Sequence, residues 1–204
     1  MTLISYRYKF IFLANMKCAS TTIHKILGKF SDESYITSKF EKPIGRHDCA
    51  LKVKTYIEEK GYNWDDFYVF TTIRNPYSRI ASCYKYEQIL KRKLPNFKDY
   101  VLTNRFLNEH FIDIMEFIGD EDGNPLIEDN NIIRIEEMNQ KLPLVLEHLE
   151  IPLELEIVPS YNRIDEFLKN DSPIKQELNN IRFDEAMIYH LKKMNINDFK
   201  YYNI

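Results

Sequence analysis

Residues 9–30 constrain the fold more than any other part of the chain, because they read as a buried strand, a tight loop and a helix. The apolar run Phe10–Leu13 is typical of a short strand that a parallel sheet buries on both faces. After the loop, apolar residues recur with helical spacing from Ile23 to Phe30, which predicts an amphipathic helix. A strand that leads into a helix through a short loop is a building unit of α/β folds.

The loop between this strand and this helix has the residue types that hold an anionic phosphate. The first N–H groups of a helix lack intrahelical partners, and the helix dipole places partial positive charge there. Lys17 adds a full charge, and the hydroxyls of Ser20, Thr21 and Thr22 add donors. It is not a Walker A loop, in which the lysine follows the loop glycines, because Lys17 comes first and no glycine is present. The alternative is an ordinary helix capped by Ser or Thr, beside a solvated lysine.

A second strand–loop–helix unit lies further along the chain. Residues 67–73 are rich in aromatic and β-branched types, which predicts a central strand. Arg74 ends this strand, and Pro76 suits the first turn of a helix expected at about residues 77–91. Both loops would leave a parallel sheet at the carboxyl ends of its strands, where ligands bind in open α/β sheets. Arg74 and Ser82 form a second candidate anion site, and two such sites suit a ligand with phosphates at both ends.

The rest of the chain predicts an α/β domain. Helices are expected at about residues 47–59, 97–104, 107–118, 138–149, 174–181 and 184–194, a short strand at 131–135 and an edge strand at 153–158. Residues 31–46 are polar and are expected to form a surface connection. We see no repeat or linker, so we predict a single domain over residues 1–204. Its expected fold is a P-loop-like three-layer α/β fold, with a central parallel sheet flanked by helices.

The composition limits the partners and the compartment. The chain has 28 Lys and Arg and 31 Asp and Glu, a net charge of −3, so we expect no nucleic-acid partner. The cysteines Cys18, Cys49 and Cys83 show no C-x-x-C spacing, which indicates neither a disulfide framework nor a metal site and favours a reducing compartment. No apolar run approaches the length of a membrane span and no signal peptide is apparent, so we expect a cytoplasmic protein. Nothing in the sequence indicates an oligomeric state.

The two loops resemble a known family. The segment N-M-K-C-A-S-T-T, residues 15–22, resembles the 5′-phosphosulfate loop of the sulfotransferases that use 3′-phosphoadenosine 5′-phosphosulfate (PAPS). The segment R-N-P-Y-S-R-I-A-S-C-Y, residues 74–84, resembles their 3′-phosphate motif. Residues 46–48, 133–136 and the terminal Asp-Phe-x-x-Tyr are similar to the Golgi-type carbohydrate sulfotransferases and their bacterial relatives. The resemblance covers nearly the whole chain, with Ala19 standing where the family commonly has a glycine.

The resemblance implies a reaction and a set of binding residues. The donor would be PAPS, the product 3′-phosphoadenosine 5′-phosphate (PAP), and the sulfuryl group would move in line to a hydroxyl or amine of an acceptor, with a carbohydrate the expected class. Arg74 and Ser82 would bind the 3′-phosphate, and Asn162 would belong to a lid over the nucleotide. The residues implied to hold the 5′-phosphate are Lys17, Cys18, Ala19, Ser20, Thr21 and Thr22.

The implied catalytic residues are Lys17 and His47. Lys17 would neutralise the charge that grows on the bridging oxygen as the donor bond breaks. His47 would act as the base that takes the proton of the acceptor, because histidine titrates near neutral pH. Alternatively, His47 only packs beside Arg46 and Asp48, and a glutamate takes the role of base, as in other relatives. Arg79 either reaches the 3′-phosphate or pairs with a carboxylate.

Two other functions compete with this hypothesis. A kinase-like P-loop phosphotransferase would have a Walker A loop and an acidic Mg²⁺ ligand at the end of a strand. Here the second strand ends in Thr71-Thr72-Ile73, followed by Arg74, with no acidic residue. A non-catalytic module that binds a phosphorylated or sulfated ligand would need the basic contacts but no base.

Overall fold

A computed structural model of the chain describes residues 2–35, 43–90, 94–103, 111–155, 157–159 and 181–204. The chain forms two compact units, of which the first comprises residues 1–73 and 115–161 and the second residues 74–114 and 162–204. The first unit holds the sheet, and the described part of the second is helical. Each unit has its own hydrophobic core, so a single domain over the whole chain stays a prediction.

The first unit is built on a five-stranded sheet in the order β3-β1-β2-β4-β5. Its strands are β1 (Leu3–Ser5), β2 (Phe10–Leu13), β3 (Glu33–Ser34), β4 (Tyr68–Ile73) and β5 (Ile132–Arg134). β2, β4 and β5 run parallel, whereas β1 pairs antiparallel with β2 and β3. The predicted fold class is therefore confirmed as a mixed α/β fold with a parallel sheet at its centre, and two unpredicted antiparallel strands extend one edge.

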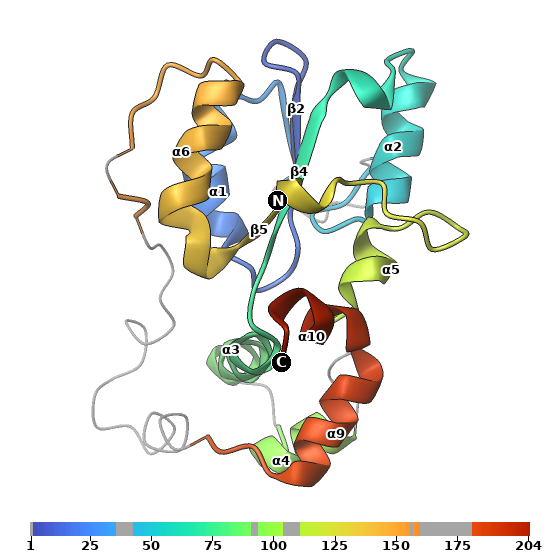
Figure 1. The fold of residues 1–204 in the computed structure, drawn as a ribbon, viewed down its shortest axis with the longest axis vertical. Coiled ribbons are helices and arrows are strands. Elements are labelled where there is room, and N and C mark those ends of the chain that lie inside the picture. Colours follow the sequence, from blue (N-terminus) through green and yellow to red (C-terminus); the bar gives the residue numbers. More distant parts are fainter. Residues whose placement is uncertain (1, 36–42, 91–93, 104–110, 156, 160–180) are drawn as a thin grey trace. The chain divides into compact units, whose positions relative to one another are not determined.

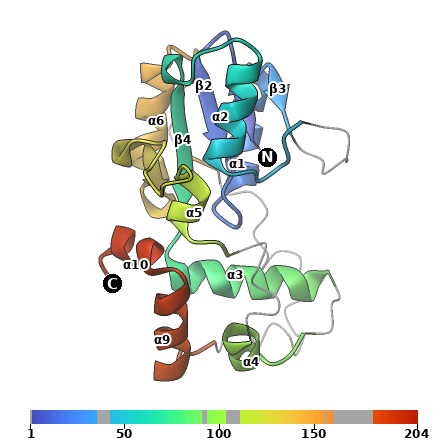
Figure 2. The same cartoon turned by 90° about the vertical axis from the view of Figure 1, so that its right-hand side faces the viewer.

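Helices cover both faces of this sheet, with α1 (Ser20–Leu27) and α6 (Met138–His148) on one face and α2 (Ala50–Glu59) on the other (Figure 1; Figure 2). All four residues of β2 are 0% exposed. A strand buried on both faces needs apolar side chains in succession rather than in alternation, which explains the sequence of β2. The core on the α1 and α6 side includes Phe10, Phe12, Ile23, Ile26, Leu27, Phe70, Leu142, Val145 and Leu146.

Shorter elements complete the first unit. They are the 3-10 helices η1 (Gly28–Phe30), η2 (Trp64–Asp66), η3 (Asp129–Asn131) and η4 (Ile135–Glu137), and the helix α5 (Ile114–Ile118), whose first residue belongs to the second unit. Across the described ranges, no helix combines the length and the apolar character that crossing a membrane requires.

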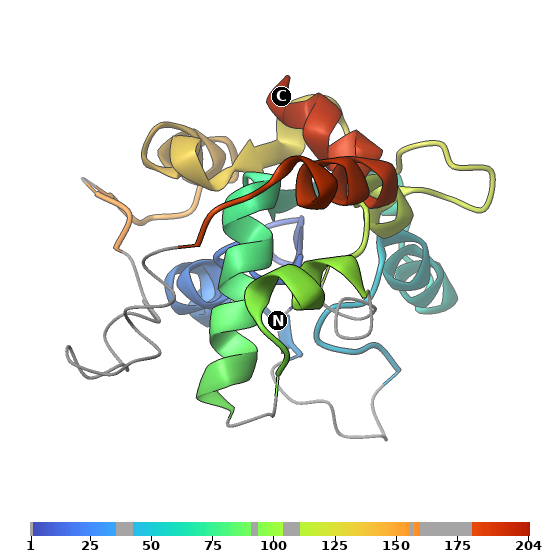
Figure 3. The ribbon, with the colours of Figure 1, turned by 90° about the horizontal axis from the view of Figure 1, so that it is seen from below.

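The second unit consists of packed helices (Figure 3), and their core is rich in aromatic side chains. Its described helices are α3 (Pro76–Ile89), α4 (Phe97–Leu102), α9 (Glu185–Met194) and α10 (Ile196–Tyr202). The core side chains are Ile80, Cys83, Tyr84, Phe97, Tyr100, Val101, Phe111, Met187, Leu191 and Phe199. The rings of Tyr84 and Tyr100 meet edge to face at 5.0 Å, a geometry that aromatic pairs prefer.

Two predicted elements are wrong in the described residues. No strand forms at residues 153–155 or 157–158; the side chains of Leu153, Leu155 and Val158 pack on the core instead, and Asn139 accepts a hydrogen bond from the Val158 N–H at 2.9 Å. The helix predicted at 107–118 is helical only from Ile114 to Ile118 in its described part. The carbonyls of residues 111 and 112 accept side-chain hydrogen bonds from outside the segment, so they are engaged in tertiary contacts. The helix predicted at 174–181 lies almost wholly outside the described residues.

The strand β3 was missed because its sequence is polar and its half-buried carboxylate, Glu33, is held by side chains of other segments. Glu33 accepts hydrogen bonds from the hydroxyls of Tyr6 at 2.5 Å and Tyr56 at 2.8 Å, from Tyr35, and from the Lys60 ammonium. Burial alone would raise the pKa of Glu33, but these donors lower it to about 2. The donors on this one carboxylate thus join β3 to the loop after β1 and to α2 with its C-terminal end.

Candidate active site

The loop after β2 has the backbone conformation of an anion site. Lys17 and Ala19 adopt left-handed φ angles of 61° and 62°, whereas Met16 and Cys18 do not. Alternating right-handed and left-handed residues turn successive backbone N–H groups toward one side, and such a concavity, called a nest, binds anions. This turn, with left-handed residues at positions 17 and 19, therefore fits an anion site even without the glycines of a Walker A loop.

The helix α1 adds its uncapped N-terminus to this loop. Ala19 is the N-cap, with no side-chain hydrogen bond to the first turn, and no acidic residue lies in that turn. The alternative of a Ser or Thr cap is therefore wrong, and the dipole of α1 is not neutralised there. Thr21 is half-buried, while Ser20 and Thr22 are buried.

Ala19 carries backbone strain that a glycine would not. A left-handed conformation costs an L-residue about 1–2 kcal/mol, because Cβ approaches the following carbonyl oxygen, and Ala19 has φ 62° and ψ 20°. This is the physical reason why a glycine suits the position. Alanine, the smallest residue with a Cβ, keeps the same loop at a moderate cost.

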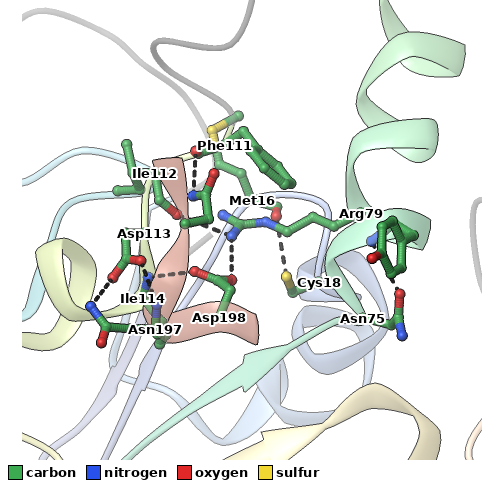
Figure 4. A network of polar contacts seen from close by, with 12 residues as sticks. Met16, Cys18, Asn75, Arg79, Phe111, Ile112, Asp113, Ile114, Asn197 and Asp198 are labelled. Atoms are coloured by element: carbon green, nitrogen blue, oxygen red, sulfur yellow. Dashed lines mark hydrogen bonds and ion pairs between the residues drawn. The ribbon is translucent and has the colours of Figure 1, made fainter. Parts of the chain in front are cut away.

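The neighbouring strand β4 anchors the loop. The hydroxyl of Thr71 donates to the Leu13 carbonyl at 2.7 Å, and that of Thr72 donates to the Cys18 carbonyl. Both threonines are fully buried. Cys18 is buried as well, and its thiol donates to the Met16 carbonyl at 3.2 Å (Figure 4). Sequence reasoning missed these contacts, because no local pattern marks them.

His47 lies at the same end of β2 as the loop. Its Nδ1 is 2.5 Å from the carbonyl oxygen of Ala14, the first residue after β2. Because a carbonyl only accepts, Nδ1 carries the proton, and in the neutral ring the lone pair is then on Nε2. Asp48 accepts from the Gly45 N–H and pairs with Lys52 at 2.6 Å. The structure thus brings the two predicted catalytic residues, Lys17 and His47, to one end of one strand.

Arg74 directly follows β4, the parallel neighbour of β2. Both strands thus end at the same edge of the sheet, as the sequence predicts. The Nε atom of Arg74 is buried and has no hydrogen-bond partner among the described residues. Leaving a buried donor unsatisfied is unfavourable, so this atom fits a site that accepts an anion. Ser82 is buried on α3, with 7% of its surface exposed.

Asn75 is the N-cap of α3, a role that the sequence analysis did not predict. Its side-chain oxygen accepts from the N–H groups of Tyr77 at 3.1 Å and Ser78 at 3.4 Å, with Pro76 as the first helical residue. Asn before Pro is a helix-start signal that could have identified this cap. The cap fixes where α3 begins and therefore how many residues separate Arg74 from the helix.

Arg79 pairs with a carboxylate, one of the two alternatives that the sequence left open. Its Nη1 lies 2.9 Å from Asp198 Oδ1 and 3.0 Å from the Ile112 carbonyl, with both charged side chains almost fully buried (Figure 4). The guanidinium also lies 5.0 Å from the centre of the Phe111 ring. The second carboxylate oxygen of Asp198 accepts the Ile114 N–H at 2.7 Å. The terminal Asp-Phe-x-x-Tyr segment therefore ties α10 to α3 and to residues 111–114.

Replacing Arg79 by methionine should lower the free energy of unfolding by about 3–5 kcal/mol near neutral pH, because Asp198 would keep a buried charge without its partner. Burial raises the pKa of Asp198 to about 6, Arg79 opposes this rise, and Asp113 adds to it. A carboxyl with a raised pKa stabilises the fold at low pH and loses that contribution as the pH rises through the folded pKa. Urea denaturation of the variant should therefore show a smaller loss at about pH 5 than at about pH 7.5.

Two control variants accompany this prediction. One removes an exposed arginine, and the other removes both charges of the buried pair. Arg182→Met removes an exposed charge of the same unit and should change stability by less than about 0.5 kcal/mol. The double variant Arg79→Met/Asp198→Asn should recover part of the lost stability, since it removes the unpaired charge and keeps an acceptor for the Ile114 N–H. If the single and the double variant lost the same free energy of unfolding, this account of the buried pair would be contradicted.

Asn162 lies outside the described residues, as do its neighbours in the expected lid. In the described part of the chain, no group of three or more His, Cys, Asp or Glu side chains could hold a metal ion.

Comparison with models of protein families adds an independent finding. The model described as "Sulfotransferase family" matches residues 1–203. Comparison with curated proteins and with solved structures finds no match.

Proposed function

Because the chain belongs to the sulfotransferase family, it is an enzyme that transfers a sulfuryl group from PAPS to an acceptor, and we propose that this acceptor is the hydroxyl or amine of a carbohydrate. The acceptor class rests on the resemblance of residues 46–48, 133–136 and the terminal segment to carbohydrate sulfotransferases. A panel of acceptors with labelled PAPS tests it. Label in phenols or arylamines and in no carbohydrate would overturn the acceptor class.

One observation carries the donor site, namely the loop of Lys17 and Ala19 in front of the uncapped helix α1. In the proposed arrangement the 5′-phosphate lies on the N–H groups of this loop, and Lys17 supplies the cation. The hydroxyls of Ser20, Thr21 and Thr22 are further donors, and Cys18 and Ala19 contribute backbone. Together, these hydroxyl and backbone donors fit the 5′-phosphate, which has several oxygen atoms that accept hydrogen bonds.

The 3′-phosphate is assigned to Arg74 and Ser82. The buried Nε of Arg74, without a partner among the described residues, supports this assignment, since a guanidinium can bind a phosphate with two parallel hydrogen bonds. Asn162 is carried over from the family as part of a lid. We propose that no metal takes part, because Lys17, Arg74 and backbone N–H groups can balance the donor charge.

PAPS, when bound, supplies an activated sulfuryl group on its 5′-phosphate. Lys17 neutralises the charge left on the phosphate side, which stabilises the transition state more than the ground state. His47 accepts the proton of the acceptor at Nε2, and its contact with the Ala14 carbonyl, which puts the proton of the neutral ring on Nδ1, supports this role. The kinase-like alternative is not retained, because the family is that of sulfotransferases.

The protein is proposed to act in the cytoplasm. The three cysteines Cys18, Cys49 and Cys83 are free thiols in the structure, which supports a reducing compartment.

The donor site predicts that PAP binds about 10- to 100-fold more tightly than adenosine 5′-phosphate, because each charge-assisted hydrogen bond contributes about 1.5–3 kcal/mol. Titration calorimetry of both nucleotides measures the ratio. Arg74→Ala should reduce the ratio toward one, whereas Arg182→Ala, which removes an exposed arginine, should leave it unchanged. Equal affinities of the unaltered protein for the two nucleotides would remove the 3′-phosphate assignment of Arg74 and Ser82.

A further inference from the structure

The backbone of the loop after β2 has a specific electrostatic requirement. A nest binds an anion with its N–H groups, while the carbonyl oxygens of the same peptides carry negative partial charge and would repel a phosphate. Each carbonyl that turns away must find a donor elsewhere, since buried carbonyls are rarely left unpaired. The donors that hold the carbonyls of this loop therefore decide how well the site is formed before any ligand binds.

In the described part of the chain, side chains donate to carbonyls of this segment. The Ala14 carbonyl accepts from His47 Nδ1, the Met16 carbonyl from the Cys18 thiol, and the Cys18 carbonyl from the Thr72 hydroxyl. A thiol is a weak donor, and Ala14 precedes the turn itself, which spans residues 16–19. Of these two donors within the turn, the hydroxyl of Thr72 is thus the stronger.

Thr72 acts on one particular peptide group. The peptide bond between Cys18 and Ala19 is trans, so the Ala19 N–H points opposite to the Cys18 carbonyl. By drawing that carbonyl toward β4, Thr72 directs the Ala19 N–H to the other side of the peptide. Ala19 is the strained left-handed N-cap of α1, so an external hydrogen bond is needed to keep this orientation against relaxation.

We propose that Thr72 is a positioning residue for the 5′-phosphate of the donor, a proposal that rests on the proposed function of the loop. It contacts no ligand itself, and it acts through the Cys18–Ala19 peptide. Thr71 offers a matched comparison, because it is an equally buried threonine of the same strand whose hydroxyl donates to Leu13, the last residue of β2, instead of to the loop.

The test compares two nucleotides that differ only at the 5′ position. Titration calorimetry measures PAP and adenosine 3′-phosphate with the unaltered protein, Thr72→Val, Thr72→Ser and Thr71→Val. Thr72→Val should weaken PAP about tenfold, the effect of one lost hydrogen bond of about 1–1.5 kcal/mol, and leave adenosine 3′-phosphate unchanged. Thr72→Ser, which keeps the hydroxyl, should bind PAP like the unaltered protein. Thr71→Val should lower the melting temperature while keeping the PAP affinity.

The outcomes separate the two proposals. If the unaltered protein binds PAP no better than adenosine 3′-phosphate, the proposed 5′-phosphate loop fails. If it prefers PAP but Thr72→Val keeps that preference, or weakens both nucleotides equally, the role of Thr72 is overturned. Thr72→Ala also lacks the hydroxyl and gives the same comparison should the valine variant not fold.

Discussion

Replacing Lys17 by alanine is expected to lower kcat about 10²- to 10³-fold, the usual effect of removing a group that stabilises transition-state charge. Lys17 is half-buried, and its backbone is left-handed, with a φ angle of 61°. Alanine tolerates that backbone about as well as lysine does, because both carry a single Cβ. The variant should therefore keep the backbone of the loop, and labelled-donor kinetics would measure its rate.

Two matched variants define the Lys17 result. Lys25→Ala removes an exposed lysine of α1, the helix that follows the loop, and should keep kcat. Lys17→Arg keeps the charge but replaces a compact ammonium by a planar fork, so it should recover only part of the rate. A Lys17→Ala variant that turns over at the unaltered rate would exclude Lys17 from the chemistry.

Replacing His47 by asparagine is expected to lower kcat about 10²- to 10⁴-fold, the range of general base catalysis. Asparagine is the informative substitution, because its side-chain N–H can replace the Nδ1–H that meets the Ala14 carbonyl at 2.5 Å. It therefore keeps the contact that positions the end of β2 but removes the basic nitrogen. PAP affinity should be unchanged, since His47 is not assigned to the donor.

The pH dependence checks the role of His47 by a second route. A base must be deprotonated to act, so the rate of the unaltered enzyme should fall on acidification through the histidine range, and the residual rate of His47→Asn should lack that limb. His148→Asn, which alters an exposed histidine at the end of α6, should keep both the rate and the limb. A His47→Asn variant with an unchanged rate would place the base on another residue.

Much of the fold could be predicted where local pattern and burial agree. The strand β2 reads as a continuous apolar run because it is buried on both faces, and Pro76 marks the start of α3 because its fixed φ suits a first helical turn. The predictions failed where distant partners decide. The edge strand β3 pairs with β1, and the donors on its Glu33 come from other segments, namely from Tyr6, Tyr56 and Lys60.

The same division holds for the candidate site. The residue types of the loop, with Lys17 first and hydroxyls after it, already predicted an anion site, because strand ends, helix N-termini and charge act locally. The partner of Arg79 could not be predicted from the sequence, because Asp198 lies 119 residues further along the chain. Because the side chains of Arg79 and Asp198 are both buried in the fold, the charge of Arg79 needs a paired carboxylate.

By itself, the sequence determined that two strand–loop–helix units carry cationic loops and that the chain has the pattern of a sulfotransferase. Only the tertiary structure decided the left-handed strain at Ala19, the proton position on His47 and the hold of Thr72 on the loop. Local composition sets which groups are available. Their direction depends on hydrogen bonds between segments that are far apart in the chain, and these form only when the sheet assembles.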